Sequence, residues 1–293
     1  MKKKGHMGVT PVFSDQNDRN YFEKDYKSTN TMLSIFETDN VTFNSELINL
    51  NFRKTVIKNL IKIGIVEKFK FKEINYDLSR VHEIIPETDK ELDEHEFNNT
   101  IKKFYDFDTD ILELYYKFIL EKIAPLFPDK VYFQKTPSFR FHFPIKKKKS
   151  NNMYHTDVML GHPPKEINIW VSITDAFLSN SLRFMNLEKS LSFVNECKMD
   201  FENFAKKVQY DKDFIKKLNQ NSKPLEMKCG EFILFDSRCL HCTQLNITNR
   251  TRVSMDIRVI QEKDYNSLKR DYTGTGRRKI KFIPGEYYNK GLI

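Results

Sequence analysis

Glycine, cysteine and long apolar runs are all scarce in this chain. Nine glycines in 293 residues exclude a collagen-like or glycine-rich disordered chain. Four irregularly spaced cysteines do not form the disulfide framework of a small secreted protein, and they favour a reducing, cytoplasmic compartment. No apolar run approaches the length of a membrane span, and no apolar stretch follows the charged start. We therefore expect neither membrane segments nor a secretion signal.

Apolar and aromatic residues are abundant instead. Phenylalanine occurs 25 times and apolar residues make up 39% of the chain, which is enough to bury one large core. We expect a single domain over residues 1–293. Within it we expect a mostly helical portion over 1–130, a strand-rich core over 131–262 and a tail over 263–293.

The formal net charge of +9 raises the question of nucleic acid binding. Lysines alternate with Glu and Asp along the predicted helices, and the strongest basic run, residues 146–149, is only four long. Such a run is typical of a solvated turn. We therefore do not expect nucleic acid as a partner, and the turn mildly favours an anionic or zwitterionic small molecule.

The first half of the chain has mostly helical periodicity. Residues 1 to about 40 are polar and aperiodic, which predicts an irregular arm. Apolar residues at helical spacing predict helices over 45–68, 89–107 and 110–127. Gly64 ends the first of these helices, and Pro125 and Pro128 close the last.

The period changes to two at Ser138, where aromatic and polar residues alternate strictly and predict a strand with one apolar and one functional face. Many short strands after a helical half predict an α+β fold, a barrel or sandwich with helices on one side. The expected strands cover residues 138–144, 153–158, 166–174, 181–186, 230–236, 239–245 and 251–260.

A helical insertion interrupts these strands. Residues 199–219 are rich in Lys and Phe at helical spacing, between a strand that ends near Val194 and one that starts near Leu225. We expect the insertion to cover about 198–222. A long insertion near the mouth of a barrel is a candidate lid.

One residue separates His155 from Asp157, and His241 lies far downstream, after the predicted strand 230–236. Residues i and i+2 of a strand point to one face, so His155 and Asp157 can share a metal while Thr156 points away. Two imidazoles and one carboxylate form the facial triad of non-haem Fe(II) oxygenases, which leaves open positions opposite. For His241, a buried core histidine is the alternative.

Arg252 and Ser254 follow on one face of the last predicted strand. A guanidinium offers a bidentate fork for the second carboxylate of a keto acid that chelates iron, and the Ser254 hydroxyl can donate to the same carboxylate. The ordered combination of H-x-D, a distant His and R-x-S is far more specific than any one of its parts.

With these motifs the chain resembles the Fe(II)/2-oxoglutarate-dependent dioxygenases of the double-stranded β-helix fold. Within them it is most similar to the phytanoyl-CoA hydroxylase-like branch and the streptomycin-biosynthesis-type oxygenases. The resemblance covers roughly residues 130–260, and a similar tail lies at 283–288. It is carried by PSFRFHFP at 137–144, YHTD at 154–157, EINIWVSITDA at 166–176, the segment from Gly230-Glu231 through His241, and TRVSMDIRVI at 251–260.

The resemblance implies a jelly-roll, cupin-like core with the N-terminal helices packed on one face. It implies a metal triad of His155, Asp157 and His241, with Arg252 and Ser254 anchoring 2-oxoglutarate. Fe(II), 2-oxoglutarate and O2 are then the cofactors, with ascorbate as a candidate reductant.

The implied reaction is hydroxylation of an unactivated C–H bond of a small molecule, such as an amino acid, a sugar or a natural-product intermediate. Succinate and CO2 are the co-products, and the sequence does not separate hydroxylation from desaturation or cyclisation. Arg140, Asn168, Trp170 and Arg258 are placed by strand alternation to face the barrel interior, where they contact substrate or support the site. An ion pair between Asp256 and Arg258 is the plainer interpretation of Arg258, and core packing is the plainer one for Trp170.

Three alternatives use the same residues differently. Cys239 and Cys242 flank His241 and suggest a zinc or redox element, but Cys197 and Cys229 are too far apart to supply the second ligand pair that structural zinc needs. A non-oxidative, cupin-type metal enzyme would use a similar triad without the arginine and serine anchor. A non-catalytic basic binding module would explain the charge but not the triad. The sequence gives no indication of the oligomeric state.

Overall fold

The computed structural model describes residues 16–46, 51–91, 98–104, 109–145, 153–268, 281–291 and 293. Within these residues the helices are α1 Gln16–Lys27, α2 Arg53–Lys62, α3 Lys70–Glu73, α4 Glu87–Lys90, α5 Asn99–Phe104, α6 Thr109–Phe118, α7 Leu187–Glu196, α8 Phe201–Tyr210, α9 Lys212–Asn221 and α10 Glu262–Asn266. The strands are β1 Asn40–Asn44, β2 Val131–Phe133, β3 Ser138–His142, β4 Ile167–Ser172, β5 Leu182–Phe184, β6 Lys223–Pro224, β7 Glu231–Asp236, β8 His241–Thr243 and β9 Arg252–Gln261.

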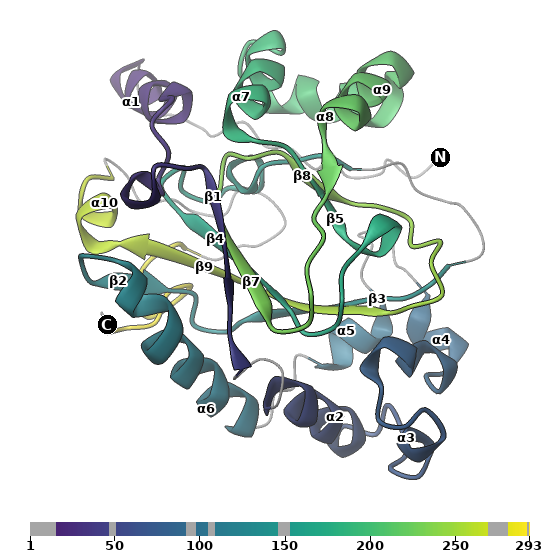
Figure 1. Ribbon diagram of the computed structural model, residues 1–293. Coiled ribbons are helices and arrows are strands. Elements are labelled where there is room, and N and C mark those ends of the chain that lie inside the picture. Colours follow the sequence, from purple (N-terminus) through teal and green to yellow (C-terminus); the bar gives the residue numbers. More distant parts are fainter. Residues whose placement is uncertain are drawn as a thin grey trace.

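The strands form two antiparallel sheets, so the expected mixture of helices and antiparallel strands is confirmed (Figure 1). The larger sheet has the order β1-β7-β4-β9-β2, with β3 also paired to β9. The smaller sheet has the order β6-β5-β8. Strand β9 has β4 on one side and both β2 and β3 on the other, so three strands pair with it.

The two faces of β9 differ in polarity because its sequence alternates with period two. Its apolar residues belong to a core cluster shared with the helices of the N-terminal half; they are Val253, Met255, Ile257 and Val259. The alternate residues are polar or charged and point to the other face; they are Arg252, Ser254, Asp256 and Arg258. The predicted division into an apolar and a functional face is therefore present in β9.

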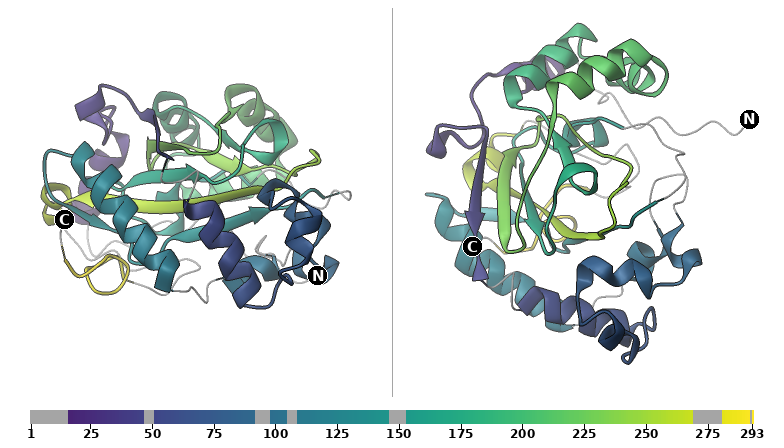
Figure 2. Two further views of the ribbon diagram at one scale, coloured as in Figure 1. Left: turned by 60° about the horizontal axis from the view of Figure 1, so that its bottom comes forward. Right: turned by 45° about the vertical axis from the view of Figure 1, so that its right-hand side comes forward.

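Helices α2, α5 and α6 cover the apolar face (Figure 2). On α6 the buried residues are Ile111, Tyr115 and Phe118, at the i, i+4, i+7 spacing that puts them on one side of a helix. The Phe118 ring packs edge-on against Phe232 of β7, with centroids 5.3 Å apart. Gly64, in the left-handed conformation at φ 72°, follows α2 as expected.

The prediction of an irregular N-terminal arm is wrong for residues 16–27, whereas residues 28–33 contain neither helix nor strand. Residues 16–27 form helix α1, and residues 40–44 form β1, the edge strand paired with β7. Polar and apolar residues do alternate in β1, where Val41 and Phe43 pack against the core, but the run of five residues is short. The register from Asn40 to Asn44 nevertheless matches five residues of β7.

The predicted insertion is helical but larger than expected. It consists of α7, α8 and α9, and Val194 lies inside α7, so the strand expected to end near Val194 is wrong. Amphipathic spacing explains the helix, since Leu187, Leu191 and Val194 are its buried residues together with Ser190. These helices lie on the side of the sheets opposite to α2–α6 (Figures 1 and 2).

Several expectations fall outside the described residues. The lysine run at 146–149 does, as do parts of the helices expected at 45–68 and 89–107 and residues 269–280 of the tail. Over the residues that the structure describes, no helix is both long and apolar enough to cross a membrane.

Candidate metal centre

His155 and His241 are brought side by side by an isolated antiparallel bridge. Each backbone N–H donates to the other residue's carbonyl at 3.0 Å. The strand expected over 153–158 is not formed beyond this bridge. Instead Thr156 caps a short 3-10 helix, Asp157–Leu160, and its Oγ1 accepts from the Met159 N–H. Asp157 thus enters the site from a helical turn, while Thr156 points away from it, as predicted.

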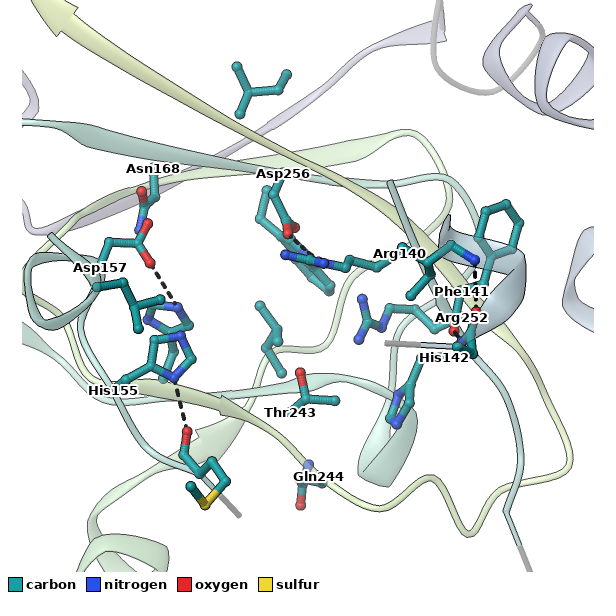
Figure 3. Close-up of a pocket in the computed structure, with 18 of the residues that line it drawn as sticks. Arg140, Phe141, His142, His155, Asp157, Asn168, Thr243, Gln244, Arg252 and Asp256 are labelled. Atoms are coloured by element: carbon teal, nitrogen blue, oxygen red, sulfur yellow. Dashed lines mark hydrogen bonds and ion pairs between the residues drawn. The ribbon is translucent and has the colours of Figure 1, made fainter. Parts of the chain in front are cut away.

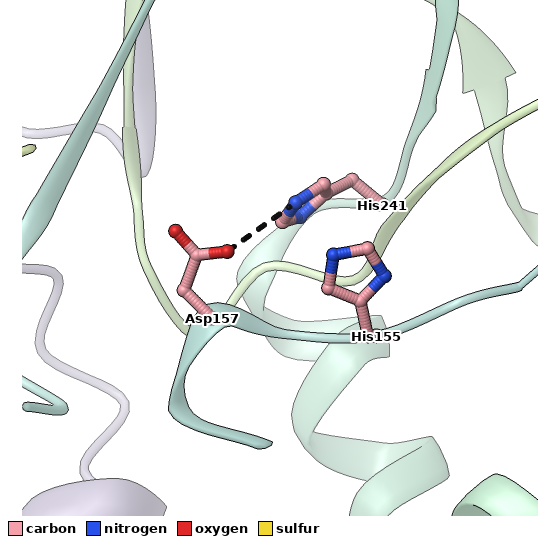
Figure 4. A group of neighbouring side chains, drawn as sticks. All are labelled: His155, Asp157 and His241. Atoms are coloured by element: carbon pink, nitrogen blue, oxygen red, sulfur yellow. Dashed lines mark ion pairs between the residues drawn. The ribbon is translucent and has the colours of Figure 1, made fainter. Parts of the chain in front are cut away.

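The three predicted ligands converge (Figure 4). One donor atom from each of His155, Asp157 and His241 lies within 4.8 Å of the other two. Nδ1 of His155 bonds to the Met153 carbonyl at 2.9 Å, and Nδ1 of His241 bonds to the Cys239 carbonyl at 3.0 Å. Because a carbonyl only accepts, both Nδ1 atoms carry a proton, which leaves Nε2 as the nitrogen that a neutral imidazole offers to a metal.

Asp157 is ionised, and one of its two carboxylate oxygens already accepts a hydrogen bond. Arg258 Nε donates to its Oδ2 at 2.8 Å, whereas its buried Oδ1 has no hydrogen-bond partner among the described residues. Burial by itself raises the pKa of Asp157, but the charge of Arg258, followed by those of His162 and His241, outweighs burial and holds the pKa well below its usual range. The free oxygen lies 3.6 Å from His241 Nε2.

These observations test whether the site fits a divalent metal. Two imidazole nitrogens with fixed tautomers and one orphaned carboxylate oxygen are the donors that non-haem Fe(II) prefers. An unpartnered buried oxygen costs about 1–3 kcal/mol unless a ligand satisfies it. The residues therefore fit the metal that the triad predicts.

The predicted ion pair between Asp256 and Arg258 is wrong. Arg258 pairs with Asp157, and Asp256 pairs with Arg140, whose Nε donates to Asp256 Oδ2 at 3.0 Å. The prediction assumed that neighbours on one strand face pair with each other. In the structure the turn that carries Asp157 comes close to Arg258 and supplies the buried charge that the guanidinium needs.

The triad opens into a cavity of about 220 Å³ (Figure 3). All four residues predicted to face the interior line it, namely Arg140, Asn168, Trp170 and Arg258. The cavity lies between the two sheets, since Leu182 of β5 and Thr243 of β8 line it as well. The described residues of α7–α9 are not among its lining residues, so the structure does not support the insertion as a lid over this cavity.

Arg252 lies at the end of the cavity away from the triad (Figure 3). Its Nε donates to the Asn180 carbonyl at 2.9 Å, and its Nη1 donates to Ser254 Oγ. The guanidinium is 5.5 Å from the centre of the Trp170 ring. Ser254 is fully buried and is not a lining residue, so in this structure it orients Arg252.

No carboxylate lies within 4.0 Å of Arg252 in the described part of the chain, although the side chain is buried. Burial lowers the pKa of Arg252 to about 10; Asp256 opposes this effect and Arg140 adds to it. A buried cation without an adjacent anion is costly. Arg252 is thus suited to hold the carboxylate of a ligand.

The sequence did not indicate the contribution of the N-terminal half to the cavity. Lys90, Asn98 and Ile101 line it, and Asn98 Nδ2 donates to the Phe141 carbonyl at 2.7 Å. These residues belong to no motif, because their part in the site depends on how the helices dock against β3.

The structural role of Arg238 was not predicted from the sequence either. It is fully buried in the turn between β7 and β8, paired with Asp236 at 2.8 Å. Its Nη1 and Nη2 donate to backbone carbonyls at and beyond the end of α1, those of Asp25, Tyr26, Ser28 and Asn30. The turn that leads to His241 is thereby tied to the N-terminal segment.

Comparison with known proteins agrees with this geometry. The family model described as "Phytanoyl-CoA dioxygenase (PhyH)" matches residues 66–254, a span that includes the triad, Arg252 and Ser254. The chain belongs to the phytanoyl-CoA dioxygenase family. This is a family of non-haem oxygenases that depend on Fe(II) and 2-oxoglutarate, so the expected resemblance and its cofactors are confirmed.

Individual relatives are more distant. The streptomycin biosynthesis protein StrG of Streptomyces griseus is 26% identical over 189 residues, which are 64% of this chain and 74% of that protein. Among solved structures, EctD from S. alaskensis with 2-oxoglutarate and 5-hydroxyectoine is 14% identical, with 94% of this chain and 89% of that chain covered and a TM-score of 0.47. The carbocyclase SnoK from nogalamycin biosynthesis is 12% identical, with coverages of 80% and 84% and a TM-score of 0.43.

Proposed function

We propose that this oxygenase hydroxylates an unactivated C–H bond of a small molecule, with succinate and CO2 as co-products. The observation that carries the proposal is that the triad and the uncompensated Arg252 face one cavity. A metal site alone would fit many enzymes, and a buried arginine alone would fit many anion sites. Their combination suits a keto acid that binds a metal at one end and a guanidinium at the other.

In this proposal His155, Asp157 and His241 hold the iron. When bound, Fe(II) with 2-oxoglutarate supplies the oxidising power for attack on a C–H bond. The backbone carbonyls behind both histidines keep Nε2 unprotonated for the metal. Arg258 holds Oδ2 of Asp157, so that Oδ1 is the oxygen left for coordination.

Arg252 holds the distal carboxylate of 2-oxoglutarate, and Ser254 supports it by holding Arg252. Ser254 and the Asn180 carbonyl fix the guanidinium from behind, so its remaining N–H groups can form a fork toward the cavity. The Trp170 ring lies beside the same guanidinium and helps to exclude water from it. A dry environment strengthens the charge interaction with the carboxylate.

We further propose that residues 1–293 act as one oxygenase domain and that the two sheets form a double-stranded β-helix. The apolar cluster between sheet and helices and the cluster around α7–α9 lie on opposite sides of the same sheet, which supports one continuous unit. Lining residues from both sheets around one cavity support the barrel.

Succinate formation tests the proposal. The protein loaded with Fe(II) is expected to convert 2-oxoglutarate to succinate, and His155→Ala is expected to lose this activity because one metal donor is removed. His82→Gln is the matched control, since His82 bonds to Thr251 outside the cavity lining. Mass spectrometry of candidate substrates should show a gain of one oxygen. Undiminished turnover by His155→Ala would refute the ligand assignment.

A further inference from the structure

Among the described residues, the Lys, Arg, Asp and Glu side chains of the cavity wall are Lys90, Arg140, Asp157, Arg252, Asp256 and Arg258. Arg258 is committed to Asp157, and Lys90 donates to the His82 carbonyl and lies beside Glu87. The proposed function assigns Arg252 to 2-oxoglutarate. The pair of Arg140 and Asp256 thus has no part yet in the metal or keto acid sites, although it faces the same space (Figure 3).

The pair is positioned differently from the other charges. Its side chains retain 25% and 18% exposure, whereas Arg252 is buried. Register places Arg140 opposite Ser254 and Asp256 opposite Trp170. Along β9 Asp256 lies between Arg252, assigned to 2-oxoglutarate, and Arg258, which holds Asp157, so the pair borders the cavity next to both sites.

Two unsatisfied polar side chains lie on β4, Trp170 opposite Asp256 and Asn168 opposite Arg258. Asn168 and Trp170 are both at most 3% exposed, and neither the amide of Asn168 nor Nε1 of Trp170 has a hydrogen-bond partner among the described residues. Both residues line the cavity, and Asn168 lies beside Asp157 (Figure 3). Buried polar groups are normally satisfied, so these atoms indicate a polar ligand.

We propose that Arg140 and Asp256 form a substrate subsite for a small zwitterion with the charge spacing of an α-amino acid, with Asn168 and Trp170 completing its hydrogen bonds. This proposal rests on the proposed function of the site. A simple anion that took Arg140 would leave Asp256 uncompensated, and a simple cation would do the same to Arg140. An ammonium group at Asp256 and a carboxylate at Arg140 satisfy both charges.

The test compares three forms of the same molecules. The twenty common L-amino acids, their N-acetyl derivatives and their methyl esters are each added to the iron-loaded protein with 2-oxoglutarate, and succinate is measured. The N-acetyl form lacks the ammonium charge and the ester lacks the carboxylate. We expect at least one free amino acid to raise succinate formation tenfold or more over the substrate-free rate, and we expect both of its derivatives to lose at least tenfold of that effect.

A variant then localises the effect. Asp256→Asn is expected to raise KM for the stimulating amino acid at least tenfold. KM for the N-acetyl form should rise less, because this form has no ammonium group to pair with the Asp256 carboxylate. Asp129→Asn is the matched control, because Asp129 pairs with Lys263 at 2.9 Å on the surface. Its KM should equal that of the wild type.

The outcomes separate this proposal from the function on which it rests. Formation of the iron and 2-oxoglutarate complex, measured without substrate, reports on the proposed function alone. If the complex forms but no free amino acid stimulates, or the derivatives stimulate equally, the zwitterion subsite is refuted. An unchanged KM in Asp256→Asn would refute it as well. If the complex does not form, the proposed function fails, and the subsite fails with it.

Discussion

Replacing Arg252 by methionine should separate binding of 2-oxoglutarate from protein stability. The side chain is buried with no adjacent carboxylate from the described residues, and burial lowers its pKa to about 10. Methionine keeps the length of the side chain and removes the charge. The Asn180 carbonyl would still accept from His142 Nδ1 at 2.9 Å, so it would not be orphaned. We expect the free energy of unfolding of the ligand-free protein to change by less than about 1 kcal/mol.

The cost should appear in binding instead. A charge-assisted hydrogen bond contributes about 1.5–3 kcal/mol, and a guanidinium fork makes two of them to a carboxylate. Allowing for partial compensation by water, a loss of about 3 kcal/mol corresponds to roughly 100-fold weaker binding of 2-oxoglutarate. The wild type should gain about 2.7 kcal/mol of stability when 2-oxoglutarate is present at about 100 times its dissociation constant. The variant should gain only about 0.4 kcal/mol at that concentration, which is then close to its own dissociation constant.

Anaerobic titration and thermal unfolding measure both quantities. Arg250→Met is the control, because Arg250 is 41% exposed, pairs with Asp77 and lies two residues away on the chain. It should bind 2-oxoglutarate like the wild type. The reasoning is refuted if Arg252→Met binds 2-oxoglutarate normally, or if it loses several kcal/mol without ligand, since Arg252 would then be a structural residue.

Three further predictions concern the surroundings of the site. Arg258→Gln leaves Asp157 as an uncompensated buried charge and should cost about 3–5 kcal/mol of unfolding free energy in metal-free protein, measured by urea denaturation; a loss below about 1 kcal/mol would contradict the pairing. Arg238→Met should destabilise the protein to a similar extent and increase proteolysis near residue 28, and protection equal to the wild type would contradict the tie to α1. Burial, and then the charge of Arg252, lowers the pKa of His142 to about 3. In the unfolded chain that pKa is about 6.5, so between these two values only the unfolded state binds the extra proton. The free energy of unfolding therefore decreases as the pH is lowered, by at most about 1.4 kcal/mol per pH unit. His142→Asn should flatten this acid limb between pH 6 and 4 in chemical denaturation, and an unchanged slope would count against a neutral, buried His142.

Local patterns predicted those parts of the site that depend on local spacing. The alternation from Arg252 to Arg258 places four polar side chains on one face whatever the rest of the chain does. The i, i+2 spacing of His155 and Asp157 brought the right residues together for a partly wrong reason, because a bridge and a helical turn replace the expected strand. Either backbone arrangement puts both side chains on the side of His241.

Long-range pairings could not be predicted in the same way. Arg258 and Asp157 are 101 residues apart, and the sequence offered Asp256 as a nearer partner. The acceptors of Arg238 are mostly backbone carbonyls, which no sequence pattern marks. Strand β1 alternates over only five residues within a polar segment, and it is defined by its pairing with β7.

The central claim is that one cavity binds iron through the triad and 2-oxoglutarate through Arg252. Anaerobic addition of Fe(II) and 2-oxoglutarate to the protein tests it most directly, because a keto acid chelated to Fe(II) has a weak visible charge-transfer band. The account predicts this band in the wild type, its loss in His155→Ala, and its recovery in Arg252→Met only at roughly 100-fold higher 2-oxoglutarate. A wild-type protein fully loaded with iron that shows no band would contradict the account.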